Sequence, residues 1–490
     1  MHFLDRREFI QQSAGLAGLI ASGYFAHDTF AAQAAQPNPP RGANERLNIA
    51  VIGVRGRGGD HISGLAGRHN CRVTHICDVD TAVTPNAVQR VQKAQGGAAP
   101  AVVQDLRRIM DNKEIHAVTI ATPNHWHSLA GIWAMQAGKH VYVEKPSSHN
   151  VREGRVTVDI ARKHNVIVQH GTQSRSDAAW ANTVEVIKSG KFGRLLVSRA
   201  LCYKIRNSIG MRPNAEPPKE VDFNLWLGPA QRTPFHANLV HYNWHWFWAF
   251  GNGDIGNQGV HQMDIARWAI QGATLPRSVV SVGGRYGYTD QGETPNTQVT
   301  LMDFGQSKLI FEVRGLRCPG YRGQTIGNVF HLEEGVIVGH RFFARGQGNG
   351  EALPQMNPRR GPGGGNHFGN FIAAVRSRRT ADLNADIEEG HYSSACCHLA
   401  NISVQMGTNA AFTPRTNAFG DNRDAIEALE RMEAHLSGEP YNLRLADLRL
   451  RVGPLLEVQA RTENFNGNAA ANRLLTRQYR EGFVVPDRVS

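Results

Sequence analysis

The sequence lacks three features, each of which would point to a different class of protein. Its six cysteines form no Cys-x-x-Cys pair, which disfavours disulfide and metal roles and favours small buried side chains. No internal stretch reaches the length of a transmembrane helix. The formal net charge of +12 could attract acidic polymers, but the basic residues form only short clusters such as Arg359-Arg360. We therefore expect no nucleic-acid partner and no metal ion.

The chain is too long for one compact core, and its composition is that of a globular protein. With 490 residues, two domains are expected. Hydrophobic residues make up 41% and charged residues 20%, which argues against a disordered chain. The sequence has no repeat period and no heptad run, so repeat and coiled-coil architectures are not expected.

The first residues have the pattern of a targeting segment. Arg6-Arg7 precedes Glu8-Phe9-Ile10, an apolar stretch runs from Ala14 to Ala26, and Ala32-Gln33-Ala34 offers a cleavage signal. The arginine pair resembles a twin-arginine signal, an export route for pre-folded proteins. The alternative is a chance arginine pair before a cytosolic domain. We expect a periplasmic or other extracytoplasmic location, with no stable membrane insertion after cleavage.

A glycine-rich turn follows the first predicted strand, 47–52. It reads Gly53-Val54-Arg55-Gly56-Arg57-Gly58-Gly59, and a helix-like stretch begins near Asp60. This order suits a pyrophosphate, because bare backbone can approach the phosphates and the N–H groups of a helix N-terminus point at them. Arg55 stands where a strict Gly-x-Gly-x-x-Gly has its second glycine, so the loop alone is a weak signal. The expected cofactor contacts in this turn are Gly53, Arg55, Gly56, Arg57 and Gly58.

An acidic residue closes the second predicted strand, 71–77. Asp78 lies twenty residues after Gly58, where a carboxylate can accept hydrogen bonds from the ribose hydroxyls of NAD. The alternative is a helix N-cap or a turn residue. Because its charge would repel a ribose phosphate, NAD is expected as the cofactor. NADP remains possible because Arg55 could meet that phosphate.

Two further strands, 116–121 and 140–143, are separated by a helix-like run that stops at Gly138. Strands alternating with helices indicate a parallel sheet, and ligands bind beyond the carboxyl ends of its strands. The expected cofactor contacts after these strands are Thr122, Pro123, Asn124, His127, Glu144, Lys145 and Gln173. His125 and His127 could be read as a metal pair, but no third ligand is evident, so capping or packing is favoured.

Several motifs occur in an order that resembles the Gfo/Idh/MocA oxidoreductases, a family named for glucose–fructose oxidoreductase and inositol dehydrogenase. The motifs are Val51-Ile52-Gly53, Ala121-Thr122-Pro123-Asn124 with His127, Gly138-Lys139-His140-Val141, Glu144-Lys145-Pro146, and Gly256-Asn257-Gln258-Gly259-Val260-His261-Gln262-Met263-Asp264. Each motif is weak, but the ordered set is specific, and it spans the chain from Leu47 to the final third.

The resemblance implies roles for three residues. Lys145 would be the family's catalytic lysine and His261 its proton-transfer histidine. Asn257 stands where the family usually has Asp, which puts the proton relay in doubt but not the fold. The alternatives are a satisfied core histidine for His261 and a phosphate-contacting or surface lysine for Lys145. The resemblance also implies that the second domain forms oligomer contacts, so a homo-oligomer is expected.

The second half of the chain predicts a different sheet. Strand-like segments separated by Gly, Asp and Asn turns suit an antiparallel sheet. They cover 195–203, 279–282, 297–301, 308–313 and 335–338. Helices are predicted over 367–378, 386–406 and 424–436. The fold class is therefore α/β, with an N-terminal Rossmann domain on a doubly wound parallel sheet and a C-terminal α+β domain on an open, mostly antiparallel sheet.

The predicted divisions follow from these patterns. They are a signal peptide over 1–34, a linker over 35–46, a dinucleotide-binding Rossmann domain over 47–170, a substrate-binding and oligomerisation domain over 171–455, and a C-terminal tail over 456–490.

The segment Tyr242-Asn243-Trp244-His245-Trp246-Phe247-Trp248 is unusually aromatic. Aromatic faces stack on the apolar faces of sugars, and Asn and His offer hydrogen bonds to hydroxyl groups. The alternative is a core strand or a subunit interface. The expected substrate contacts are Tyr242, Asn243, Trp244 and His245, together with Lys145 and His261.

These residues predict an enzyme that moves a hydride between a nicotinamide cofactor and a secondary hydroxyl of a sugar or polyol. Oxidation needs a base for the hydroxyl proton, a role for which we predict His261 because histidine titrates near working pH. Lys145 would stabilise the developing alkoxide. One alternative is a glycosidase that uses bound NAD for transient oxidation followed by elimination. Another is a non-catalytic protein that binds a sugar or the cofactor.

Overall fold

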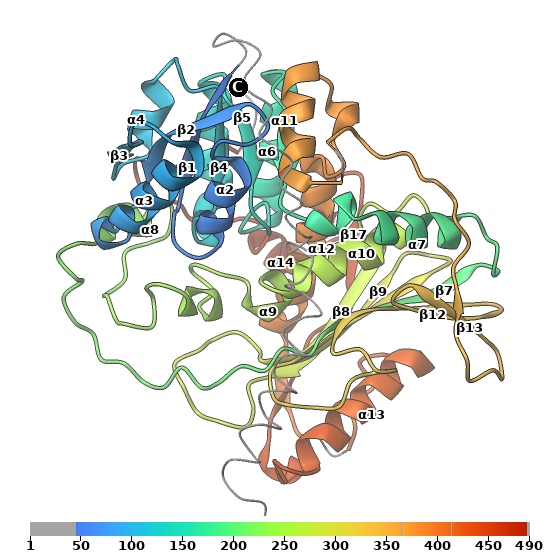
Figure 1. The fold of residues 1–490 in the computed structure, drawn as a ribbon. Coiled ribbons are helices and arrows are strands. Elements are labelled where there is room, and N and C mark those ends of the chain that lie inside the picture. Colours follow the sequence, from blue (N-terminus) through green and yellow to red (C-terminus); the bar gives the residue numbers. More distant parts are fainter. Residues whose placement is uncertain (1–45, 364, 413, 488–490) are drawn as a thin grey trace, which may run out of the picture. The chain divides into compact units, whose positions relative to one another are not determined.

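The computed structural model describes residues 46–363, 365–412 and 414–487, and its elements are labelled in Figure 1. The predicted signal peptide and almost all of the predicted linker lie outside the described residues. From Leu47 onward the chain forms one compact unit built on two sheets.

The first sheet is the predicted Rossmann sheet. Its order is β3-β2-β1-β4-β5-β6, and every pairing is parallel. The strands are β1 Leu47–Ile52, β2 Cys71–Cys77, β3 Ala101–Val103, β4 Ala117–Ile120, β5 His140–Val143 and β6 Val168–His170. Strands β4 and β5 are buried at every position, since helices cover both faces of the sheet. The strand order reverses between β1 and β4, which is where such sheets bind ligands.

Five helices connect these strands. They are α2 Arg57–Leu65, α3 Thr84–Gln95, α4 Arg107–Asp111, α5 His127–Gln136 and α6 Val151–Lys163. Helix α2 begins at Arg57, three residues before the start near Asp60 that the sequence predicts. Gly56 precedes it with φ of 55°, a backbone conformation that glycine adopts without strain.

A helix from the second half of the chain completes the first domain. Helix α11, His367–Ser377, buries Phe368, Phe371 and Val375 in the same core cluster as Ile49 of β1. Figure 1 shows α11 close to β5, and the ring of Phe368 lies 4.9 Å from that of Tyr142 on this strand. The sequence predicted the helix from its apolar spacing. Only the structure shows that its apolar face covers the first sheet.

The second sheet is mostly antiparallel, as predicted, and has twelve strands. The order of ten is β14-β13-β12-β11-β7-β10-β9-β8-β16-β15, β17 pairs with both β8 and β18, and only β7 with β10 is parallel. The strands are β7 Leu195–Cys202, β8 Ser278–Gly284, β9 Thr297–Asp303, β10 Lys308–Arg314, β11 Ile326–Leu332, β12 Gly335–Val338, β13 Arg341–Ala344, β14 Glu351–Ala352, β15 Thr408–Ala410, β16 Leu450–Val452, β17 Leu456–Gln459 and β18 Asn464–Phe465.

Side chains alternate between the two faces of this sheet along each strand, and apolar side chains occur on both faces. Helices therefore cover both faces. On β10, Leu309 and Phe311 belong to the core cluster of helices α7, α10 and α12. Ile310, which points the other way, belongs to the cluster of α13. These helices are α7 Ala178–Lys188, α10 Gly259–Ala269, α12 Ile387–Met406 and α13 Arg423–Ser437.

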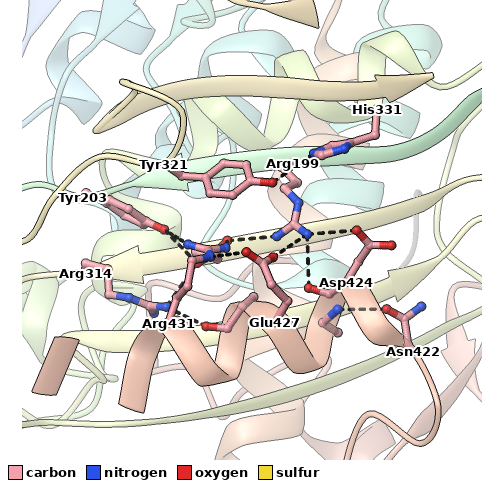
Figure 2. Close-up of polar contacts among 12 residues, drawn as sticks. Arg199, Tyr203, Arg314, Tyr321, His331, Asn422, Asp424, Glu427 and Arg431 are labelled. Atoms are coloured by element: carbon pink, nitrogen blue, oxygen red, sulfur yellow. Dashed lines mark hydrogen bonds and ion pairs between the residues drawn. The ribbon is translucent and has the colours of Figure 1, made fainter. Parts of the chain in front are cut away.

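A buried ion network holds α13 against the sheet (Figure 2). Glu312 of β10 is fully buried and accepts hydrogen bonds from Tyr203 Oη at 2.7 Å and Arg431 Nη2 at 2.5 Å. Arg199 of β7 reaches Asp424 Oδ1 on α13 at 3.0 Å. Burial opposes ionisation of Glu312, but the charges of Arg314 and Arg431 lower its pKa overall. Because its charges pair with one another, we assign this network a structural role.

Short elements complete the chain. They are α8 Phe223–Leu227, α9 Gly253–Gly256, α14 Ala469–Arg473, and the 3-10 turns η2 Thr81–Val83, η3 Asn124–Trp126, η4 Gln173–Ser176, η5 Asn243–Trp246, η6 Thr380–Asp382 and η7 Leu445–Asp447. The segment predicted as a tail contributes β17 to the second sheet, and its Phe483 is buried against the first domain. All six cysteines are free thiols, and five of them are buried. Among the described helices, none has the length and apolarity to cross a membrane.

Candidate active site

The turn between β1 and α2 packs backbone directly against backbone. A Cβ on Gly53 would lie 2.7 Å from the carbonyl oxygen of Ala121, and a Cβ on Gly58 would lie 1.8 Å from the carbonyl oxygen of Gly53. A Cβ on Gly56 would instead meet no described atom within 4 Å. The two glycines are therefore needed for close packing, while Gly56 leaves open space in front of the helix N-terminus.

Asp78 fastens this turn from the end of β2. Its Oδ2 accepts the N–H of Val54 at 2.9 Å, and its Oδ1 accepts the N–H of Asp80 at 3.0 Å. Burial raises the pKa of Asp78, and the two backbone hydrogen bonds only partly offset that effect. Each carboxylate oxygen keeps a second lone pair, so the turn role and the predicted ribose contact are compatible. Arg55 is exposed beside this turn.

Glu144, at the end of β5, is buried and bound by side chains from α2 and from the turn η4. It accepts hydrogen bonds from Arg57 Nε at 2.7 Å and Gln173 Nε2 at 3.4 Å, and it lies 3.2 Å from His61 Nε2. Burial opposes its ionisation, but the charge of Arg57 and the contact with His61 hold the pKa of Glu144 well below its usual range. Arg57 and Gln173 thus face Glu144, and Arg57 also pairs with Asp60 at 3.1 Å.

The loop after β4 provides a polar atom with no assigned partner. Thr122 Oγ1 is buried and, among the described residues, has no hydrogen-bond partner. His127 lies behind it, with Nε2 2.8 Å from the carbonyl oxygen of Thr122 and Nδ1 2.6 Å from that of Pro146. Asn124 donates to Asn252 Oδ1 at 3.1 Å. His127 and Asn124 therefore position loops, and Thr122, beside Pro123, offers a free hydroxyl.

These features fit a dinucleotide. The close glycine turn, the space at Gly56 and the N-terminus of α2 suit a pyrophosphate. Asp78 retains acceptor capacity for a ribose hydroxyl, and the orphaned Thr122 hydroxyl lies at the carboxyl end of β4. The carboxyl edge of β1, β2 and β4 is therefore the candidate dinucleotide site.

Lys145 joins the two domains. Its Nζ donates to the backbone carbonyl of Asn257 at 2.7 Å, which lies at the end of α9 in the second domain. Burial lowers the pKa of Lys145, and the charge of Glu144 opposes that change. The structure thus brings Lys145 and Asn257 into contact, and the third predicted catalytic residue, His261, lies close enough for the charge of Lys145 to lower its pKa.

His261 follows one turn later, in the first turn of α10. Burial, and next the positive charge of Lys145, lower the pKa of His261 to about 3. The ring is therefore neutral at ordinary pH. Its pKa lies well below the range on which the predicted role of His261 as a base depends. The side-chain amide of Asn257 donates to Tyr242 Oη at 3.3 Å, not to His261.

The aromatic segment is a 3-10 turn, not a strand. Trp246 is fully buried, and Trp244 donates its indole N–H to the carbonyl oxygen of His241 at 3.1 Å. His245 is buried, with Nδ1 2.7 Å from the carbonyl oxygen of Tyr242. Asn243 donates to Asn238 at 3.4 Å. Of the four predicted substrate contacts in this segment, Tyr242 is the one whose side chain reaches Asn257.

Three charged residues that the sequence did not predict surround Tyr242 directly or through a partner: Arg206, Lys204 and, through Arg206, Asp254. Arg206 donates to Tyr242 Oη at 3.0 Å and holds the buried carboxylate of Asp254 at 2.9 and 2.6 Å. Lys204 donates to Gln258 Oε1 at 3.0 Å. Lys204 and Arg206 lie one and three residues after the predicted strand 195–203, and Asp254 precedes Asn257 by three residues. Their positions at the end of a strand and beside a motif could have indicated them.

The segment between β7 and α9 also reaches the end of β2. Asp80 forms a bridge with Val221, and Thr81 donates its N–H to the carbonyl oxygen of Glu220 at 3.0 Å. His241 Nε2 lies 3.1 Å from Asp80 Oδ2. The same segment thus contacts the candidate dinucleotide site at Asp80 and the Lys145 region at Tyr242. In the described part of the chain, no group of three His, Cys, Asp or Glu residues could hold a metal ion.

Comparisons with known protein families match both domains. Residues 47–172 match the oxidoreductase family model for the NAD-binding Rossmann fold of Gfo/Idh/MocA proteins. Residues 198–288 match the model for the C-terminal α/β domain of the same family.

Two curated relatives have names that refer to glycoside cleavage. A glycosyl hydrolase family 109 protein of Shewanella baltica is 30% identical over 217 residues, which cover 41% of this chain and 46% of that protein. An alpha-N-acetylgalactosaminidase of Shewanella oneidensis is 28% identical over 216 residues, with the same coverage of 41% and 46%. The match spans less than half the length of either relative.

Similar solved structures include two sugar-binding dehydrogenases. A levoglucosan dehydrogenase in complex with NADH and levoglucosan has a TM-score of 0.53 at 19% identity, over 73% of this chain and 96% of that one. The WlbA dehydrogenase from Bordetella pertussis, in complex with NADH and UDP-GlcNAcA, has a TM-score of 0.52 at 19% identity, over 72% and 95%. At these identities the likeness shows the fold.

Proposed function

We propose that this protein, which has both domains of the Gfo/Idh/MocA oxidoreductase family, transfers a hydride between NAD and a secondary hydroxyl group of a sugar or polyol. The observation that carries the proposal is the 2.7 Å contact between Lys145 Nζ and the carbonyl oxygen of Asn257. It sets a half-buried cation at the carboxyl edge of the Rossmann sheet, against the loop that leads to His261. Titratable groups concentrated at such an edge are typical of active sites.

Each residue has a distinct task in this reaction. Bound NAD supplies the hydride acceptor for oxidation. The Lys145 ammonium stabilises negative charge that develops on the substrate oxygen, an interaction that strengthens in a partly buried site. Neutral His261 can accept a hydrogen bond from a substrate hydroxyl at a ring nitrogen and so orient it. Glu144 keeps its negative charge beside Lys145 and thereby favours the ammonium form.

A second candidate is a glycosidase that oxidises its substrate transiently. The names of the Shewanella relatives favour it, with 28–30% identity over the matched region. A ketone next to the bond to be broken acidifies the neighbouring C–H, so elimination can follow, and the reverse hydride transfer restores the cofactor. The two candidates share the site and differ in whether NADH accumulates.

One experiment separates these candidates. The purified protein, denatured and analysed for released nucleotide, should yield NAD rather than NADP, because Asp78 would repel a ribose phosphate. Free sugars, polyols and aryl glycosides are then screened with NAD present. NADH formation from a sugar or polyol supports the dehydrogenase, and release of the aryl group without net NADH supports the glycosidase. Released NADP, or neither activity, would contradict the proposed function.

We also propose export through the twin-arginine route, on the basis of Arg6-Arg7 and the apolar stretch that follows, which lie outside the described residues. Arg6→Lys with Arg7→Lys should leave the protein in the cytoplasm, because the paired guanidinium groups are what the export receptor reads. Cell fractionation with immunodetection measures this. Unchanged export of the double variant would indicate a general secretion signal instead.

A further inference from the structure

The phenol oxygen of Tyr242 has an unusual set of partners. It accepts one hydrogen bond from the Arg206 guanidinium at 3.0 Å and one from the Asn257 amide at 3.3 Å. Both partners donate to this oxygen through N–H groups, and the Arg206 guanidinium carries a full positive charge. Such a pair stabilises a negative oxygen more than a neutral one.

Tyr242 is also accessible and lies close to the proposed reaction centre. Its relative exposure is 49%, whereas the neighbouring His245 and Trp246 are 1% exposed. Asn257 connects it to Lys145, since the side chain of Asn257 contacts Tyr242 and its carbonyl accepts Lys145 Nζ. A substrate oxygen held at Lys145 would therefore lie in the same polar cluster as the phenol.

We propose that Tyr242 transfers the hydroxyl proton of the substrate in this reaction, with Arg206 and Asn257 as the residues that position and activate it. In oxidation, the tyrosinate Oη takes the hydroxyl proton while the hydride from the same carbon passes to NAD. The alcohol becomes a carbonyl, the tyrosinate becomes a neutral phenol, and NAD is reduced to NADH. The inference rests on the proposed function and assigns the proton step to a residue for which the sequence predicted only substrate binding.

The charges around the phenol favour its ionised form. Burial raises the pKa of Tyr242, but the charge of Arg206, the two hydrogen bonds and the charge of Lys204 together lower it below its ordinary value. Lys145 interacts favourably with the same phenolate. His245, whose ring lies 4.8 Å away, is neutral because burial lowers its pKa to about 4.

One acidic group lies nearby, and it does not oppose this arrangement. Both carboxylate oxygens of Asp254 accept hydrogen bonds from Arg206, so the carboxylate pairs with the guanidinium and not with the phenol. Burial, and next the charge of Lys145, lower the pKa of His261 to about 3, which weakens it as a base. The pKa of Tyr242 is instead lowered from the ordinary tyrosine value toward the working pH, which suits a base that accepts an alcohol proton.

The first test compares two tyrosine variants. Tyr242→Phe should lower kcat/KM for a substrate found in the sugar and polyol screen by about a hundredfold or more, as is typical when a general base is lost, while NAD stays bound. It should also remove the rise of kcat/KM with pH, because that rise follows ionisation of the phenol. Tyr392→Phe is the matched control. Tyr392 also packs against two arginines, at 5.5 and 5.6 Å, but it donates its hydroxyl to Glu388 and its pKa is raised.

A second readout does not depend on activity. Phenolate absorbance in the near ultraviolet, followed against pH, should show a tyrosine that ionises below the ordinary value of about 10. This component should be missing from Tyr242→Phe and present in Tyr392→Phe. If Tyr242→Phe loses no early-ionising component, the inference is overturned, whatever substrate the protein takes.

A double variant separates Tyr242 from His261. Asn257→Asp sets a carboxylate against the phenol oxygen, which should raise the pKa of Tyr242 and move the acid limb of kcat/KM toward higher pH. In a Tyr242→Phe background the same substitution should move no limb. If the limb moves equally in both backgrounds, His261 is the titrating base and the inference fails. A wild-type protein with no oxidising or glycoside-cleaving activity would instead contradict the proposed function, and the absorbance titration would still decide whether Tyr242 ionises.

Discussion

Replacing Lys145 by methionine should lower turnover by about a hundredfold or more while the protein still releases NAD on denaturation. Methionine keeps the length and much of the apolar volume of the lysine stem but has no charge and no N–H donor. It therefore loses both the contact with the Asn257 carbonyl oxygen at 2.7 Å and the stabilisation of a developing alkoxide. Steady-state kinetics with the identified sugar measure the effect, which should fall on kcat more than on KM.

The control for this variant is Lys191→Met. Lys191 is exposed in the turn after α7, so its loss should leave both kcat and NAD content unchanged. Full activity of Lys145→Met would show that Lys145 takes no part in the reaction. Loss of NAD together with activity would show that Lys145 acts mainly in holding the cofactor.

Replacing Gly58 by alanine should abolish NAD retention. The new Cβ would lie 1.8 Å from the carbonyl oxygen of Gly53, so α2 and the turn must move apart. That movement carries the helix N-terminus away from the pyrophosphate position. The overpacking should also lower the free energy of unfolding by about 1–3 kcal/mol. The measurements are nucleotide release per protein chain and thermal unfolding.

Gly131→Ala is the matched control, because it introduces the same methyl group into a helix of the same domain. Its Cβ would lie 3.9 Å from side-chain atoms of Ile120 and Val141, an ordinary contact distance. A helix interior gains about 0.5–1 kcal/mol from glycine to alanine, so this variant should retain NAD and unfold no more easily. Retention of NAD by Gly58→Ala at the level of this control would refute the assigned geometry of the turn.

Local pattern was enough to predict the first sheet and much of its ligand edge. A strand, a glycine turn and a helix form one contiguous unit, so Gly53, Gly58 and Asp78 could be selected from spacing alone. Lys145 was found in the same way, since it follows a predicted strand and belongs to a short motif. The antiparallel character of the second sheet followed from strand-like segments separated by Gly, Asp and Asn turns. All these features depend on residues close together in the chain.

The tertiary structure decided which distant segments pack against one another. The 3.6-residue period of α11 shows that one face of the helix is apolar, but either sheet could have packed against that face. The structure packs it against the first sheet, although the helix follows the strands of the second sheet in sequence. Histidine titrates near neutral pH in water, yet burial beside Lys145 lowers the pKa of His261 to about 3. Tyr242 and Arg206 lie 36 residues apart, and their contact depends on how a long connecting segment folds back. Sequence determined which groups are present and which local units they form, because hydrogen bonding and side-chain spacing act over a few residues. Burial and charge proximity, which set the pKa values at this site, depend on contacts between distant segments and were decided only by the fold.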